Sequence, residues 1–176
     1  MNIVATIEMF EALYNVTYYT VRLEIDDIVE EETETDKFLS TFLDEPETPT
    51  IEAQDIYNLI EEIGNRGAFK RYFRFENNAN ALPPKNKYLE ELGIDHEVEK
   101  ELNLRLYCIR LSDNIVILIN GGIKTTDSVQ DCPNVSQYFR DANKIATLID
   151  EAILEREISI DNHELIFDKD FYLKLS

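Results

Sequence analysis

The pattern of apolar and polar side chains predicts several strands in the first and second thirds of the chain. Val16–Ile25 (VTYYTVRLEI) is rich in β-branched and aromatic residues, which is typical of a strand. Leu102–Leu111 and Ile115–Asn120 are apolar at nearly every position, as expected for strands in the buried middle of a sheet. Ser112-Asp113-Asn114 between them favours a hairpin turn. A further strand, rich in aromatic and basic residues, is predicted over Phe69–Phe75.

Helical spacing of apolar residues predicts three helices. The first ends before Pro46, and its apolar positions are Phe38, Leu39, Phe42 and Leu43. The second follows a proline-rich loop and has its apolar face at Ile56, Leu59, Ile60 and Ile63. The third runs from Pro133 to about Leu154 and has the strongest periodicity in the chain.

The remaining segments give weaker predictions. Residues 1–14 are ambiguous, although Ile7, Phe10 and Leu13 favour a short helix. Asn77–Lys87 is predicted to be a loop, and Tyr88–Glu101 a short charged helix or connector. Apolar and polar residues alternate on both sides of Asp161-Asn162-His163-Glu164, which predicts a hairpin at the end of the chain.

The order of these elements predicts the fold class. A strand, two helices, three strands and a long helix precede the terminal hairpin. We therefore expect an α+β fold in which two N-terminal helices and one long helix from the C-terminal half pack on a small antiparallel sheet. No internal repeat or flexible linker divides the chain, so residues 1–176 are expected to form one domain with a C-terminal hairpin extension at 155–176.

The charge of the chain is strongly negative and unevenly distributed. The net charge is -19, from 36 acidic and 17 basic residues. Residues 1–66 carry 17 acidic and 3 basic residues, whereas residues 67–125 carry 8 acidic and 9 basic ones. The negative field of the whole chain repels polyanions, so non-specific nucleic-acid binding should be poor. One cationic patch could still form if folding gathers the basic residues of the middle third, Lys70, Arg71, Arg74, Arg105, Arg110 and Lys124.

Composition also bears on the compartment. No apolar run approaches the length that a membrane span requires, so we expect no membrane partner. The N-terminal residues lack the basic start and long apolar run of a signal peptide. The two cysteines, Cys108 and Cys132, are expected to be reduced thiols. These features favour a cytoplasmic protein.

Two short motifs suggest ligands but do not meet the spacing that such sites need. Gly121-Gly122, followed by Lys124, lacks the GxxxxGK[ST] pattern of a phosphate loop. We instead expect the two glycines to end the strand, where they permit a positive φ. The segment Asp95–Glu99 alternates charged residues around His96, which is typical of a solvated face. We therefore predict neither a metal nor a cofactor.

Three segments together resemble a known family. LRLYCIR contains Arg105 and Arg110, and IVILINGGIKTT contains Lys124 and leads to the helix with Ala142. Upstream lies IGNRGAFKRYFRFE. Over about residues 16–152 this pattern resembles the RelE/ParE toxin superfamily, in particular its HigB-like branch, whose members place two N-terminal helices against a small antiparallel sheet.

The resemblance implies a function for the basic residues. The chain would be the toxin-like component of a type II toxin–antitoxin system and would cleave ribosome-bound mRNA without a metal ion. Arg105 and Lys124 would contact the scissile phosphate. Lys70, Arg71, Arg74 and Arg110 would position the RNA strand, and a cognate antitoxin would be the protein partner.

A second hypothesis follows from the acidic composition. The same scaffold could be a non-enzymatic interaction protein that binds a basic protein partner, with the acidic run Asp26–Glu34 as the docking face. Whichever hypothesis holds, the alternate residues Lys70, Tyr72 and Arg74 of the predicted strand could simply face solvent or pair with nearby acids. Arg105 and Arg110 are separated by five residues of a strand and are expected on opposite faces, so one of them could be purely structural.

Overall fold

The computed structural model describes residues 1–44, 48–94, 103–125, 132–133 and 135–176. The strands are β1 (Ile3–Ala12), β2 (Thr17–Ile25), β3 (Ile28–Val29), β4 (Arg74–Glu76), β5 (Ala79–Leu82), β6 (Leu104–Ser112), β7 (Ile115–Ile123), β8 (Ile158–Asp161), β9 (Glu164–Phe167) and β10 (Leu173–Lys174). The helices are α1 (Glu34–Leu43), α2 (Thr48–Arg66), the short 3-10 helix η1 (Lys70–Tyr72), α3 (Asn86–Glu91) and α4 (Ser136–Leu154).

Eight strands form one sheet in the order β10-β1-β2-β7-β6-β5-β4, with β3 paired to β2. All described pairs in it are antiparallel except β2 with β7, which run parallel over Thr17–Tyr19 and Ile115–Ile117. The expected α+β class with a mostly antiparallel sheet is confirmed. The sheet is larger than the small one predicted, because both ends of the chain add strands to it.

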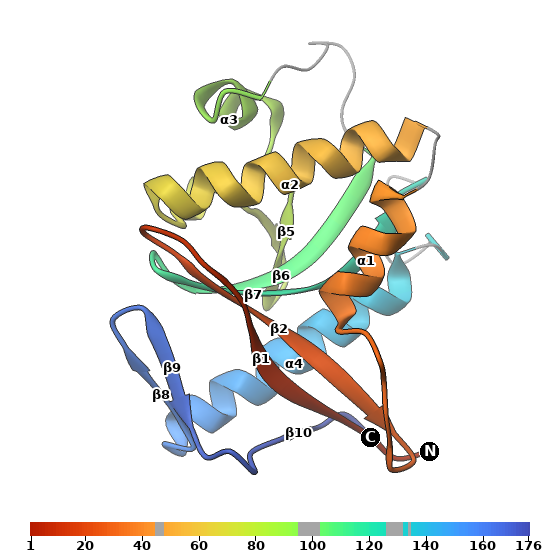
Figure 1. Cartoon of the computed structure of the whole chain (residues 1–176), viewed down its shortest axis with the longest axis vertical. Coiled ribbons are helices and arrows are strands. Elements are labelled where there is room, and N and C mark those ends of the chain that lie inside the picture. The colour runs from red at the N-terminus through yellow and green to blue at the C-terminus, as the bar shows by residue number, and fades with distance from the viewer. Residues whose placement is uncertain (45–47, 95–102, 126–131, 134) are drawn as a thin grey trace.

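Helices cover both faces of the sheet (Figure 1). On one face, which we call the α2 face, α1, α2 and α3 bury a core with Phe38, Ile60 and Leu89. On the other, the α4 face, the long helix packs with Ile145 and Ile149 against Tyr107 and the inner residues of β7. Apolar residues occupy both sides of the central strands, which is why β6 and β7 lack the alternation of a half-exposed strand.

The N-terminal residues form β1, and the helix expected there is wrong. Ala5 and Ile7 are buried on the α4 face, with the period of two that a strand requires. The pairing with β2 shifts between Met9 and Glu11, where a bulge interrupts the register. Phe10 is the extra residue of this bulge and packs on the opposite, α2 face. Apolar residues on both faces of β1, at a spacing of three, imitate a helix.

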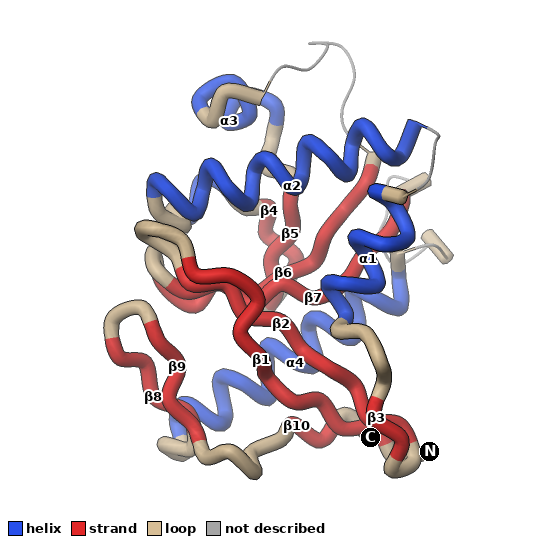
Figure 2. Tube along the Cα trace, viewed as in Figure 1, coloured by secondary structure: helices blue, strands red, loops and turns tan. Residues whose placement is uncertain are grey.

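The segment from residue 69 to 87 also differs from the prediction. Lys70–Tyr72 is a 3-10 turn, so the strand begins only at Arg74. The predicted loop contains strand β5, which pairs with β4 on one side and β6 on the other (Figure 2). The sequence of β5, ANAL, has weak strand propensity. Its neighbours in the sheet impose the conformation.

Strand β7 continues through Gly121 and Gly122 to Ile123, so the expectation that the glycines end it is wrong. Neither has a positive φ. A Cβ at Gly121 would lie 1.7 Å from the carbonyl oxygen of Arg105 on β6. Gly121 is needed because the β6–β7 pairing is irregular here and the two backbones approach closely.

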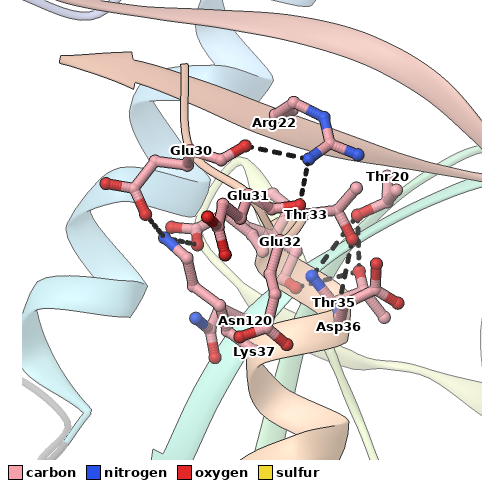
Figure 3. A network of polar contacts seen from close by, with 12 residues as sticks. Thr20, Arg22, Glu30, Glu31, Glu32, Thr33, Thr35, Asp36, Lys37 and Asn120 are labelled. Atoms are coloured by element: carbon pink, nitrogen blue, oxygen red, sulfur yellow. Dashed lines mark hydrogen bonds and ion pairs between the residues drawn. The ribbon is translucent and has the colours of Figure 1, made fainter. Parts of the chain in front are cut away.

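Helix α1 begins where β2 and β7 separate beyond their short parallel pairing. The hydroxyl of Thr33 accepts a hydrogen bond from the amide of Asp36 at 3.1 Å and caps the helix. Thr35, which is fully buried, joins the two strands (Figure 3). Its hydroxyl lies 2.7 Å from the hydroxyl of Thr20 on β2 and donates to the carbonyl of Ile119 on β7 at 3.0 Å.

Basic side chains of the protein itself neutralise part of the acidic run that leads into α1. Lys37 pairs with Glu30 at 2.8 Å and with Glu34 at 3.0 Å (Figure 3). Arg22 pairs with the carboxylate of Glu8 and donates to the backbone carbonyls of Glu30 and Glu31. These contacts hold the connection between β3 and α1 against β2.

The C-terminal residues return to the first strand. β8 and β9 pair as an antiparallel hairpin, and the amide of Leu165 donates to the hydroxyl of Tyr19 at 2.9 Å. β10 then pairs with β1 at Val4 and Ala5, which brings the two termini side by side (Figure 1). Residues 155–176 therefore complete the core of the α4 face and the edge of the main sheet.

Candidate functional site

A groove on an otherwise acidic protein gathers basic and aromatic side chains at the β4 edge of the sheet. It has a volume of about 530 Å³ and lies between η1, β4 and the start of α3. Its lining residues are Lys70, Arg71, Phe73, Arg74, Phe75, Glu76, Lys85, Lys87 and Tyr88. Five of these nine are basic and one is acidic, whereas acidic residues outnumber basic ones two to one in the whole chain. A positive field is therefore concentrated here.

Two arginines of the groove are fixed by neighbours. Arg71 binds Glu91 in a bidentate ion pair, with a shortest distance of 2.6 Å, and its guanidinium stacks 4.7 Å from the centre of the Tyr72 ring. These hydrogen bonds lower the pKa of Glu91. Arg74 donates to the carbonyl of Pro83 at 2.8 Å. Both are thus held as rigid parts of the groove wall.

The lysines of the groove are exposed. Among the described residues, Lys70, Lys85 and Lys87 take part in no salt bridge, and Lys87 lies 4.8 Å above the Tyr88 ring. Phe75, on the edge strand, is 79% exposed. Exposed ammonium groups beside an exposed aromatic ring are the two elements that bind single-stranded nucleic acid, through its phosphates and its bases.

Glu76 lines the same groove and has an unusual environment. Burial raises the pKa of its carboxyl, although the positive charges of Lys124, Arg105 and Arg74 act in the opposite direction. The raised pKa brings the carboxyl closer to neutral pH, where it can exchange a proton efficiently. A perturbed carboxyl in a cleft, surrounded by cations, marks a candidate site.

The structure brings Arg105 and Lys124 toward the same carboxyl, but their surroundings differ. Arg105 is only 4% exposed and donates to the carbonyl of Leu104. Lys124 follows the end of β7, is partly exposed, and its amide donates to the carbonyl of Asn103 at 2.8 Å. Both charges act on Glu76. As folded, Arg105 offers a bound phosphate almost no surface, and its predicted direct contact with RNA remains a prediction.

Tyr107 is a buried polar residue next to this cluster. Its hydroxyl has no hydrogen-bond partner among the described residues, and burial raises the pKa well above the usual tyrosine value. The tyrosine therefore stays protonated and neutral. Its ring packs against Phe139 of α4, which places it in the core and away from the groove surface.

Arg110 does not line the groove that contains Lys70, Arg71 and Arg74. Its guanidinium donates to the carbonyl of Ala68 and pairs with Asp113 at the β6–β7 turn. Ala68 belongs to the core of the α2 face, whereas Arg105 acts on Glu76 and Tyr107. Arg110 thus has the structural ion pair that was one of the alternatives for it. Arg71 also has an ion pair, with Glu91.

Sequence reasoning missed part of the groove. Lys85 and Lys87 lie in a segment that was predicted to be a loop, and they were not proposed as site residues. The pattern PPKNK could have indicated them, because two prolines stiffen the chain before the two lysines. Glu76 and Phe75 lie in the FRFE segment, whose alternation places an acid two residues after Arg74. The histidine segment at 95–99 lies outside the described residues.

Comparison of the chain with family models, with curated proteins and with solved structures found no match. Within the described ranges, no helix combines the length and the apolar character needed to cross a membrane. Nor do three His, Cys, Asp or Glu side chains come together there in a group that could hold a metal ion.

Proposed function

We propose that this chain binds single-stranded RNA in the β4-edge groove and cleaves it without a metal ion, as the toxin-like component of a toxin–antitoxin module. The observation that carries the proposal is the groove itself. It concentrates five basic residues and an exposed phenylalanine around Glu76, on a protein of net charge -19. Such a groove offers charge to the backbone of a strand and an aromatic surface to its bases.

The arrangement around Glu76 supports a cleavage chemistry. Metal-free cleavage of RNA begins when a base removes the proton of a 2′-hydroxyl, and the oxygen then attacks the adjacent phosphorus. The bond from this phosphorus to the 5′ oxygen breaks, which leaves a 2′,3′-cyclic phosphate, and the departing 5′ oxygen takes up a proton from water. Glu76 is the base in this proposal. Lys124 stabilises the negative charge that develops on the phosphate oxygens. Buried Arg105 acts on Glu76 through its charge and is a positioning residue.

The order of elements supports the resemblance on which the toxin assignment rests. Strand β2 and the short β3 are followed by helices α1 and α2, then by η1, strands β4 and β5, helix α3, strands β6 and β7, and helix α4. Strand β1, the β8–β9 hairpin and β10 are additions to this core. The additions lie on the far side of β2 from the groove, so they leave the proposed RNA site open.

The test compares matched pairs of lysines. A labelled single-stranded RNA is titrated at low salt with the wild type, with Lys85→Ala/Lys87→Ala, and with a control, Lys169→Ala/Lys174→Ala. The control removes two exposed lysines next to and within β10, which lies at the opposite edge of the sheet from β4. Each lysine that meets a phosphate contributes roughly -0.7 to the slope of log K against log salt. We expect the groove variant to lose about 1.4 from this slope and the control to lose none.

Cleavage is measured separately, in the presence of a chelator. Glu76→Gln should abolish RNA cleavage while RNA affinity stays within about twofold, because the amide cannot accept the proton. RNA binding that is indifferent to both lysine pairs would contradict the proposed groove. Cleavage that survives Glu76→Gln would remove the proposed base and leave only the binding function.

A second candidate function is favoured by a different surface. Ile28 and Val29 of β3 are 72% and 58% exposed, and Asp26, Asp27 and Glu31 around them are exposed as well. An apolar pair within an acidic rim fits a basic protein partner. If the wild type binds no RNA at all, this interaction function becomes the better proposal.

A further inference from the structure

A second, smaller hollow opens beside the groove, on the other side of Phe75. It has a volume of about 200 Å³, and its lining residues are Lys70, Phe75, Asn77, Asn78, Ala79, Asn80 and Arg110. Lys70 and Phe75 line both hollows and therefore form the wall that the two hollows share. Five of the nine lining residues of the larger hollow are basic, whereas three of the seven in the smaller one are asparagines, beside Lys70 and Arg110. We call the smaller one the amide pocket.

Phe75 and Asn80 lie side by side in the amide pocket. They are directly opposed residues of the antiparallel pair β4–β5. Side chains at such positions project from the same face of the sheet, with Cβ atoms about 5 Å apart. A flat ring stacked on Phe75 would therefore present its edge to the amide of Asn80.

The hydrogen bonds around the pocket fix which groups it offers. The backbone amide of Arg110 donates to Oδ1 of Asn80 at 3.0 Å, so this atom is the oxygen and Nδ2 points away as a donor. No described residue accepts a hydrogen bond from that Nδ2. Lys70 adds an ammonium group with no salt bridge among the described residues.

The side-chain amide of Asn78, which also lines the pocket, is already engaged in a hydrogen bond. Asn78 donates from Nδ2 to the hydroxyl of Thr147, and its backbone amide donates to Oδ1 of Asn143, both on α4. Oδ1 of Asn143 also accepts from the amide of Ala79. The β4–β5 turn is thus anchored to α4, which keeps Phe75 and Asn80 in a fixed relation.

We propose that the amide pocket binds a guanine base that stacks on Phe75 and accepts hydrogen bonds from Nδ2 of Asn80 and Nζ of Lys70. Guanine presents two adjacent acceptors, O6 and N7, on one edge. Adenine presents a donor, its 6-amino group, where O6 would be. Adenine keeps the N7 acceptor, but one of the two donors would face its amino group and lose its hydrogen bond, so adenine is disfavoured.

This inference rests on the proposed function, because the groove next to the pocket would hold the phosphates of the strand that carries the guanine. The base could also come from a free nucleotide. The shared chemistry is a guanine ring, and the experiment separates the two sources.

The test uses four labelled uridine-tract RNAs that carry G, A, C or U at one central position. The wild type should bind the G oligonucleotide roughly tenfold more tightly than the A oligonucleotide, within the range of one bidentate base contact. Asn80→Asp keeps the acceptor for the Arg110 amide but replaces the donor by a second acceptor. The affinities of this variant for the G and A oligonucleotides should differ by no more than about twofold. Its affinity for the oligonucleotides with the amino-bearing bases A and C should rise relative to G.

Two further variants make the result specific. Asn65→Asp makes the same charge change at an exposed position at the end of α2 and should leave the ranking of the four oligonucleotides unchanged. Phe75→Ala should weaken all four, by about five- to a hundredfold per stacked base, and should keep G ahead.

The outcomes separate this inference from the proposed function. Equal affinity of the wild type for all four oligonucleotides, or a ranking that Asn80→Asp leaves intact, would contradict guanine binding in the amide pocket. Neither result would contradict RNA binding in the groove. Binding of GMP that is weakened by Asn80→Asp, without binding of any RNA, supports the pocket and overturns the RNA function. If the wild type binds neither GMP nor RNA, both are overturned.

Discussion

Replacement of Thr35 by valine tests how the sheet is held together where β2 and β7 separate. Thr35 is fully buried at the start of α1, and its hydroxyl donates to the carbonyl of Ile119 and contacts the hydroxyl of Thr20 (Figure 3). Valine has nearly the same shape but no hydroxyl. The change therefore removes two hydrogen bonds and creates no large cavity.

The expected cost follows from what the valine leaves behind. Ile119 lies at the irregular part of β7, between the residues that pair with β6, and it is 2% exposed. A buried carbonyl that loses its partner costs about 1–3 kcal/mol. The hydroxyl of Thr20 keeps only the amide of Thr35, at 3.4 Å. We expect Thr35→Val to lower the free energy of unfolding by about 2–4 kcal/mol.

Urea unfolding followed by circular dichroism measures this cost, with Thr41→Val, an exposed threonine of the same helix, as the control. The control should change the free energy of unfolding by less than about 0.5 kcal/mol. Thr20→Val should cost about 1 kcal/mol, and the double variant should cost about 1 kcal/mol less than the sum of the two single variants. A Thr35→Val cost equal to that of Thr41→Val, or strict additivity, would refute the proposed bridge.

Two other substitutions test the site and the sheet. Burial raises the pKa of Glu76 in the folded state, so the stability tied to its protonated form is lost as pH rises through that pKa. The free energy of unfolding of Glu76→Gln, relative to wild type, should therefore increase with pH above about 4, and a decrease in acid–urea titrations would show that the cations dominate instead. Gly121→Ala would place its Cβ 1.7 Å from a backbone oxygen and should cost about 3 kcal/mol or more. Gly93→Ala, in open space at φ +76°, should cost about 1–2 kcal/mol, and equal costs in urea unfolding would contradict the close approach of β6 and β7.

Local sequence determined much of the architecture. β2, β6 and β7 follow from continuous runs of apolar, β-branched and aromatic residues, and α2 and α4 follow from helical periodicity. Each buries enough apolar surface to be specified by its own residues. β1 was misassigned because both of its faces carry apolar residues, Ile7 on the α4 face and Phe10 on the α2 face, at a spacing that a helix shares. β5 was missed because its four residues form a strand only between two partners.

The site shows the same division. Charge counts located the basic residues in the middle third, and Lys70, Arg71 and Arg74 do line one groove. Only the tertiary structure shows that Lys85 and Lys87 line the same groove. It also shows that Arg110 pairs with Asp113 at a turn and that Arg105 is buried. Sequence periodicity reports which face of its own element a side chain occupies. Which faces meet depends on strand order and on where a sheet ends, and these are set by contacts between residues far apart in the chain.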